Sequence, residues 1–147
     1  MPRSTHRSSF RRLGRAREGT VAVELAIVGP VFILLMFGMI AYGIYFGAAH
    51  SMQQLAADAA RASVAGLDED ERTRLAERFV SLNSSQYMLI DPEAVTISAA
   101  GSARDASQFL VSVSYDARQL PIWNLHVPLP LPEQMIMRTS TIRVGGV

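Results

Sequence analysis

The sequence of 147 residues contains neither cysteine nor lysine. Without cysteine, the chain cannot form disulfides, use a thiol in catalysis or bind a metal through thiolates. An exported domain of this kind depends for its stability on a small core, on the membrane or on partner proteins. All 14 basic residues are arginine, which we attribute to genome composition rather than to mechanism.

Recognisable catalytic motifs are also missing. The three histidines, His6, His50 and His126, lie far apart in the sequence, and none has a metal-ligand partner at a diagnostic spacing. There is no GxSxG elbow, SxxK motif, phosphate-binding loop or GxGxxG sequence. The acidic cluster at residues 68–71 is better explained as the start of a helix. We therefore expect no enzyme activity, no metal site and no cofactor.

Charged side chains are absent from one long stretch, the 25 residues from Leu25 to Ala49. About 20 apolar residues suffice for a helix to cross the hydrocarbon core of a bilayer. The rest of the chain is an ordinary mixture of polar and apolar residues, and its length allows one small domain with appendages. The sequence therefore predicts a single-pass membrane protein with a modest extramembrane part.

Charge is distributed unevenly on the two sides of this stretch. Residues 1–19 hold six arginines and one acidic residue, whereas residues 20–147 hold eight arginines and twelve acidic residues, a formal charge of −4. Arginines beside a span mark its cytoplasmic side, so we expect the N-terminus inside and the C-terminus outside. Nucleic-acid binding by the arginines is disfavoured, because topology explains them and no aromatic or folded context accompanies them.

The predicted span contains proline and several glycines. Pro30 lies near its start, where a missing amide donor costs least, and we expect a kink there. Gly43 and Gly47 form a GxxxG pattern, which allows close packing of helices in lipid, although glycine is common in spans in any case.

The helix is expected to continue beyond the bilayer as an amphipathic helix that ends at Gly66. Its apolar face is set by residues spaced three and four apart, namely Met52, Leu55, Ala56, Ala59, Ser63 and Leu67.

A second helix is predicted for residues 68–85. Asp68 can cap it, Glu71 occupies the capping-box position, and acidic residues fill its first turn. Leu75, Phe79 and Leu82 are expected to form its buried stripe.

The periodicity changes to two residues after this helix, which is typical of strands. Three β-rich runs are predicted within residues 94–99, 109–115 and 135–144, separated by linkers. The proline-rich part of the second linker is expected to be a stiff loop, with a ligand segment as the alternative.

The fold class is therefore α+β: a long N-terminal transmembrane and amphipathic helix, a second short helix and a small antiparallel β-sheet. The expected division is a basic cytoplasmic leader (1–19), the membrane helix with its extracytoplasmic extension (20–66) and a small extracytoplasmic head (67–147).

The junction between leader and span carries the most specific pattern. A basic leader, expected to be disordered, ends at Gly19, Glu24 is the fifth residue after that glycine, and Pro30 follows within the apolar helix. Together with Val23 and Ala26, these residues resemble the TadE-like family of tight-adherence (Tad/Flp) pilus systems. The resemblance covers about residues 14–65 well and the remainder only in outline.

The resemblance implies a minor pilin or pseudopilin in the bacterial cytoplasmic membrane. A prepilin peptidase would cut between Gly19 and Thr20, and Glu24 would pair with the new amine of a neighbouring subunit to set the register. The implied partners are that peptidase, other pilins and Tad assembly components, besides membrane lipid; no nucleic acid is expected. The sizeable head argues against the main filament subunit, because major Flp pilins are much shorter.

Three alternatives stay open at this point. Glu24 could lie at the cytoplasmic interface of an ordinary single-pass anchor that is never cut. The apolar stretch could be a secretory signal cleaved near Ala49, although it is longer than the usual 7–15 apolar residues of such signals. The chain could also be a membrane-tethered binding protein of the cell envelope.

Overall fold

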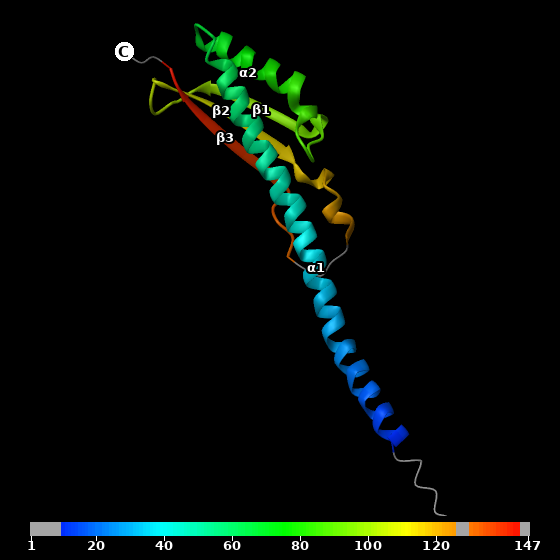
Figure 1. Ribbon diagram of the computed structural model, residues 1–147. Helices are drawn as coiled ribbons and strands as arrows, with labels where there is room; N and C mark the ends of the chain where they lie inside the picture. The colour runs from blue at the N-terminus through cyan, green and yellow to red at the C-terminus, as the bar shows by residue number, and fades with distance from the viewer. Residues whose placement is uncertain (1–9, 126–129, 145–147) are drawn as a thin grey trace, which may run out of the picture. The chain divides into compact units, whose positions relative to one another are not determined.

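The computed structural model describes residues 10–125 and 130–144, with side chains described from residue 22 onward. The predicted α+β fold is confirmed (Figure 1). Its helices and strands are α1 (Phe10–Ser63), α2 (Glu69–Asn83), β1 (Val95–Gly101), β2 (Gln108–Asp116) and β3 (Met135–Arg143).

The described residues fall into two units. Residues 10–39, which belong to α1, form part of the first. Residues 40–125 and 130–144 belong to the second, which we call the compact unit. The second part of α1 therefore folds together with α2 and the sheet, whereas the predicted head begins only at residue 67.

The three strands form one antiparallel sheet in the order β1-β2-β3, which the sequence left open. Val95 pairs with Tyr115 across the first two strands, and Asp116 pairs with Met135 across the next two. Side chains of β2 alternate strictly between buried and half-buried, which confirms the period-two prediction. One face of the sheet is thus committed to the core.

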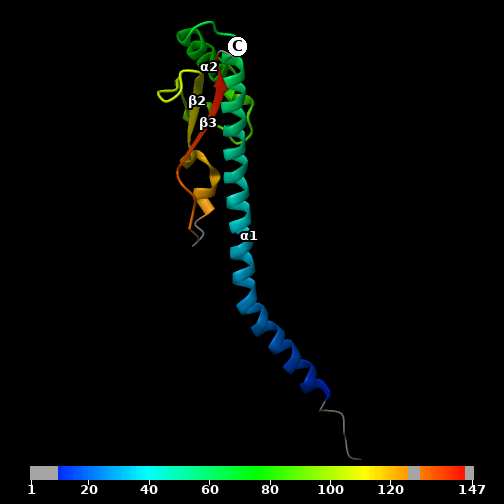
Figure 2. The same ribbon diagram turned by 90° about the vertical axis from the view of Figure 1, so that its left-hand side faces the viewer.

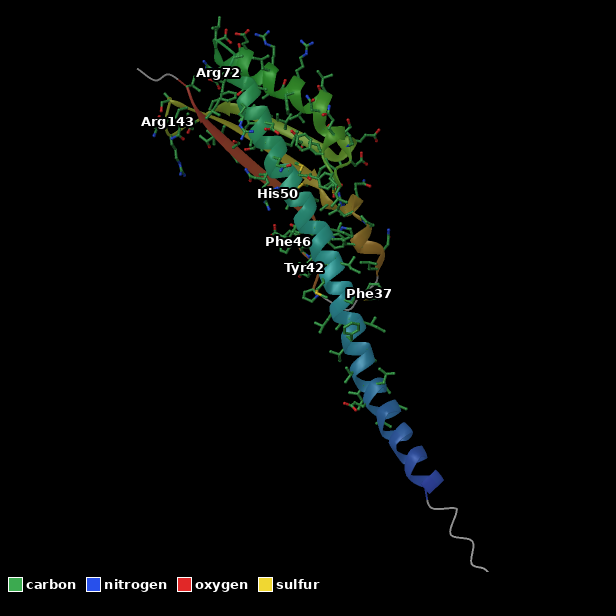
Figure 3. The ribbon with its side chains drawn as sticks, in the orientation of Figure 1. Phe37, Tyr42, Phe46, His50, Arg72 and Arg143 are labelled. Carbon is green, nitrogen blue, oxygen red and sulfur yellow. The ribbon has the colours of Figure 1, made fainter. Side chains whose placement is uncertain are left out.

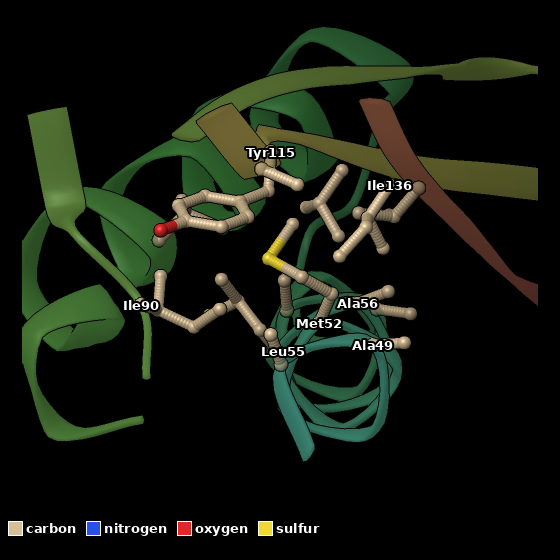
Figure 4. Close-up of a cluster of buried hydrophobic side chains, with 14 of the residues drawn as sticks. Ala49, Met52, Leu55, Ala56, Ile90, Tyr115 and Ile136 are labelled. Carbon is tan, nitrogen blue, oxygen red and sulfur yellow. The ribbon is translucent and has the colours of Figure 1, made fainter. Parts of the chain in front are cut away.

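The core of the compact unit lies between this face and the second part of α1 (Figure 2). Met52 of α1, Tyr115 of β2 and Ile136 of β3 are buried and point toward one another (Figure 4). Alanines make up most of the helix surface in the core, and their small size lets the helix lie close to the sheet. They are Ala41, Ala48, Ala49, Ala56, Ala59 and Ala60.

Helix α2 begins as the sequence predicts. The Asp68 carboxylate accepts a hydrogen bond from the Glu71 amide at 2.7 Å, and the Glu71 carboxylate accepts one from the Leu67 amide at 2.8 Å. This reciprocal arrangement satisfies two amides that the helix itself leaves unpaired.

The predicted buried stripe of α2 is partly wrong. Leu82 is 63% exposed, and Leu75 and Phe79 are only half-buried, whereas Ala76 and Val80 are buried. The helix is rotated so that its smaller residues face the core. This rotation brings α2 close to the edge of β1, where Thr73 donates a hydrogen bond to the Ala99 carbonyl at 3.2 Å.

Two further expectations about α1 need correction. The leader, predicted to be disordered, is helical from Phe10 onward, because helix formation is cooperative and propagates from the apolar segment through residues with adequate propensity. Residues 1–9 lie outside the described residues. At the other end, α1 stops at Ser63, so Leu67 leaves the helix and is 89% exposed. The other five residues of the predicted face are fully buried, which confirms that part of the prediction.

Candidate functional site

The predicted processing junction lies within α1. Gly19 and Thr20 have helical backbone, and their side chains lie outside the described ones. The prediction of a cut site therefore rests on their position in the sequence, between the arginine-rich leader and the apolar segment.

Glu24 follows on the same helix, and its side chain is exposed. Among the side chains that the structure describes, none forms a hydrogen bond or ion pair with Glu24. The residues that follow it are apolar and exposed as well, including Leu25 at 67% and Ile27 at 68%. Glu24 is thus a carboxylate at the start of an uncovered apolar surface, an arrangement that suits pairing with a group outside this chain.

This apolar surface fits a bilayer. Within the described residues, one helix, Ala22–Ser63, is long and apolar enough to cross a membrane, and only 6% of its most apolar 18-residue window is buried. The low burial separates this window from the core helix of a soluble domain, whose apolar residues are mostly covered. The helix is therefore compatible with single-pass anchoring. Pro30 lies inside it, exposed, and the kink expected there stays a prediction.

The two glycines of the predicted packing motif have different surroundings. A Cβ atom added at Gly43 would meet no atom within 4 Å, whereas one added at Gly47 would lie 3.0 Å from Leu89 Cδ1. Leu89 has a positive φ of 63°, a conformation that costs a non-glycine residue energy. Gly47 thus accommodates a loop of its own chain, and only Gly43 leaves its surface open for another helix.

A groove of about 510 Å³ opens beside Gly47, between α1 and the end of α2. His50 and Gln54 lie on its α1 side, with 3.0 Å between their Nε2 atoms. Its lining combines polar and apolar side chains and is completed by Ser51, Phe79, Asn83, Gln86, Tyr87 and Met88.

Tyr87 connects this groove to α1. Its hydroxyl donates a hydrogen bond to the Asp58 carboxylate at 2.8 Å, and Arg61 forms an ion pair with the same carboxylate. Burial, followed by the hydrogen bond to Asp58, raises the pKa of Tyr87 to about 12. The sequence does not predict this pair, because 29 residues separate its members.

Aromatic residues gather on α1 at the end of the charge-free stretch, a feature that the sequence motifs did not indicate. Tyr42 and Phe46 lie near each other on α1 (Figure 3). The ring centroid of Phe46 is 6.0 Å from that of Tyr42 and 6.1 Å from that of Tyr45. The Tyr42 hydroxyl donates a hydrogen bond to the Pro130 carbonyl at 2.7 Å. The signal that could have found them is their position, since aromatic residues gather where a span meets the water interface.

Among the described residues, no group of three or more histidine, aspartate or glutamate side chains is close enough to hold a metal ion.

Comparison with protein families gives one match. Residues 19–61 match the family described as TadE-like protein, so the resemblance inferred from the sequence is confirmed over this segment. The match begins at Gly19 and includes Glu24, Pro30 and both glycines of the packing motif. Searches of curated proteins and of solved structures each found no similar protein. The chain thus carries a TadE-like segment, followed by a domain to which the family match does not extend.

Proposed function

We propose that this chain is a minor pilin or pseudopilin that takes part in assembly of a Tad/Flp type pilus, and that its role is structural rather than catalytic. The observation that carries the proposal is the start of the TadE-like match at residue 19, the glycine at which the basic leader ends. The apolar helix anchors the protein in the bacterial cytoplasmic membrane, with the arginine-rich end inside.

The leader is removed by a prepilin peptidase that cuts between Gly19 and Thr20 on the cytoplasmic side. Glycine suits the position before the cut, because it has no side chain to obstruct a narrow cleft and its backbone bends readily. Removal of the leader takes away all six of its arginines. It also creates an α-amino group on Thr20, which is positively charged near neutral pH.

Glu24 then sets the register between subunits. A lone carboxylate within a bilayer costs about 2.5–3.5 kcal/mol on insertion scales, and no described side chain of the same chain compensates for it. Pairing with the Thr20 amine of a neighbouring subunit offsets this cost and fixes the axial position of one helix against the next. The exposed surface of residues 22–39 supports such packing between helices.

The compact unit supports an accessory role. Its core combines a sheet and two helices, which is more structure than a filament made mainly of packed helices requires. An accessory subunit initiates, anchors or tips the pilus and so contributes to adhesion, and it presents this unit outside the membrane.

The proposal is tested by the mature N-terminus, determined by intact mass and peptide sequencing of protein from native membranes. We expect a start at Thr20 in cells with an active prepilin peptidase and the full leader in cells without it. Gly19→Val should slow removal of the leader, whereas Gly14→Val, at the other leader glycine, should leave it unchanged. An intact N-terminus in the presence of active peptidase contradicts the proposal and favours a plain anchor. A start near His50 contradicts it in favour of a secreted protein.

The role of Glu24 is tested separately. Glu24→Ala should leave membrane insertion intact, because insertion becomes easier without the charge, but it should reduce crosslinking between subunits and the yield of pili. Glu77→Ala, an exposed position on α2, is the matched control and should change neither. Normal crosslinking and pilus yield in the Glu24→Ala protein would exclude the register role without affecting the cut at Gly19.

A further inference from the structure

The linker between β2 and β3 is unusually apolar for a connection at the surface. Residues 119–132 contain no aspartate, glutamate, arginine or lysine, and they include four prolines and the single tryptophan of the chain. Among the described residues of this linker, Pro121 and Pro130 are exposed, and Trp123, Leu125 and Leu131 are half-buried. An exposed loop normally consists of polar residues, so this composition calls for an environment other than bulk water.

The backbone of the linker is also suited to a region with little water. Prolines have no N–H group, so four of these residues present no amide donor that needs a partner. The first half folds into short 3-10 turns, in which the Leu120 amide donates to the Ala117 carbonyl at 3.0 Å. The Trp123 indole donates to the same carbonyl at 2.6 Å. Several polar groups that would require water are thus satisfied internally or absent.

One hydrogen bond fixes the position of the linker along α1. The Tyr42 hydroxyl donates to the Pro130 carbonyl across a sequence separation of 88 residues. Tyr42 belongs to the charge-free stretch of α1, and twenty residues counted from Leu25 end at Ile44. Since about 20 residues cross the hydrocarbon core, Tyr42, Tyr45 and Phe46 fall at its outer boundary, where tyrosine and tryptophan concentrate.

We propose that residues 121–125 and 130–132 form an interfacial element that lies in the outer headgroup region of the bilayer beside α1. Lipid is the occupant that the observations favour, because the element is attached to the helix at the boundary of its span. Two further apolar side chains are exposed, Phe46 by 63% on α1 and Met135 by 51% at the start of β3. Contact with a second protein is the competing explanation. The inference rests on the membrane anchoring of the proposed function but not on leader processing.

The single tryptophan provides the test. The full-length protein is reconstituted into nanodiscs, and Trp123 fluorescence is quenched either with a lipid that carries a spin label close to its headgroup or with iodide in the water. We expect strong quenching by the labelled lipid and weak quenching by iodide. Quenching by iodide alone would overturn the proposal, because the element would then lie in water. Absence of quenching by either reagent would overturn it as well, because protein would then cover the indole.

Two reporter variants calibrate this measurement, each combined with Trp123→Phe. Leu67→Trp places the reporter at the exposed turn between α1 and α2, at the other end of the compact unit (Figure 1), and only iodide should quench it. Phe32→Trp places it in the charge-free stretch of α1, and a label deep in the acyl chains should quench it. If Phe32→Trp is lipid-quenched and wild-type Trp123 is not, the interfacial element is excluded while the anchor stands. If neither is lipid-quenched, the anchor itself fails. The mature N-terminus is an independent measurement in either case.

A second test removes the hydrogen bond from Tyr42 to the Pro130 carbonyl. Tyr42→Phe removes only the donor hydroxyl and should reduce quenching of Trp123 by the headgroup label, because the linker loses its attachment at that depth. Tyr45→Phe removes a hydroxyl three residues further along α1 and should leave quenching unchanged. Equal quenching in both variants and the wild-type protein would show that the linker reaches the bilayer without Tyr42 and would overturn the attachment that the inference uses.

Discussion

The two parts of helix α1 both present an apolar surface, but they differ in the size of the apolar side chains and in how much of each is exposed. In residues 22–39 the apolar side chains are large, and Phe32, for example, is 64% exposed. In residues 41–60 alanine dominates the buried face, and no alanine of that face is more than 5% exposed. Apolar content alone predicts a helix in both parts. Side-chain size distinguishes the part that packs closely on a sheet from the part that is free to meet lipid.

The carboxylates of the two parts differ in the same way. Asp58, in the second part, is paired with Tyr87 and Arg61 of its own chain. Glu24, in the first part, has no partner among the described side chains. A carboxylate that is satisfied within the chain stabilises the fold, whereas one left unsatisfied at the start of an apolar surface is suited to assembly.

The largest effect that separates the two parts is expected from removal of an aromatic ring. Phe109 is 1% exposed in the core, so Phe109→Ala leaves a cavity and should lower the free energy of unfolding of the compact unit by about 3–5 kcal/mol. Phe32→Ala removes the same ring from the exposed part of α1 and should change that free energy by less than about 0.5 kcal/mol. Hydrogen exchange of the strand amides, in full-length protein in nanodiscs, measures both. Equal effects would contradict the division of α1 into two environments.

The sequence predicted those features of the fold that depend on local rules. The cap at Asp68 needs only residues three positions apart, and the alternation of Phe109, Val111, Val113 and Tyr115 needs only the geometry of a strand. For the candidate site, the local pattern formed by Gly19, Val23, Glu24, Ala26 and Pro30 suggests a family, and the comparison supports that family over residues 19–61.

The features that were missed depend on contacts between distant residues. The rotation of α2 leaves Leu82 exposed and places Ala76 and Val80 in the core. The bonds from Tyr87 to Asp58 and from Tyr42 to Pro130 join segments 29 and 88 residues apart. Periodicity within a helix does not determine its rotation against a neighbour, since several faces of α2 carry apolar residues.

A second, smaller contrast involves two glycines. A Cβ atom added at Gly66 would lie 2.7 Å from the Arg72 backbone nitrogen, whereas one added at Gly43 would meet nothing within 4 Å. Gly66→Ala should therefore destabilise the compact unit by about 1–3 kcal/mol through forced backbone movement. Gly43→Ala should stabilise α1 by roughly 0.5–1 kcal/mol, because alanine is the better helix former. Thermal unfolding in nanodiscs measures both, and a loss of stability in the Gly43→Ala protein would indicate that this face is covered in the folded protein.

A third contrast depends on pH and involves the hydroxyl that pairs with Asp58. Burial and the hydrogen bond to Asp58 raise the pKa of Tyr87 to about 12, from about 10 in an unfolded chain. The folded state therefore holds this proton more tightly than the unfolded state. The resulting stability is fully present below about pH 10. As the pH rises toward 12, about 1–2 kcal/mol of it is lost.

Tyr87→Phe should lower stability at neutral pH by about 1 kcal/mol and should remove this part of the alkaline loss. Tyr115, whose pKa is also raised by burial, is present in both proteins, so its contribution cancels when their unfolding curves are compared at each pH. Parallel stability curves for the two proteins across that range would show that the hydroxyl is as well solvated in the folded protein as in the unfolded chain. Asp58 would then keep only its ion pair with Arg61, and the contrast between the two carboxylates of α1 would be weaker.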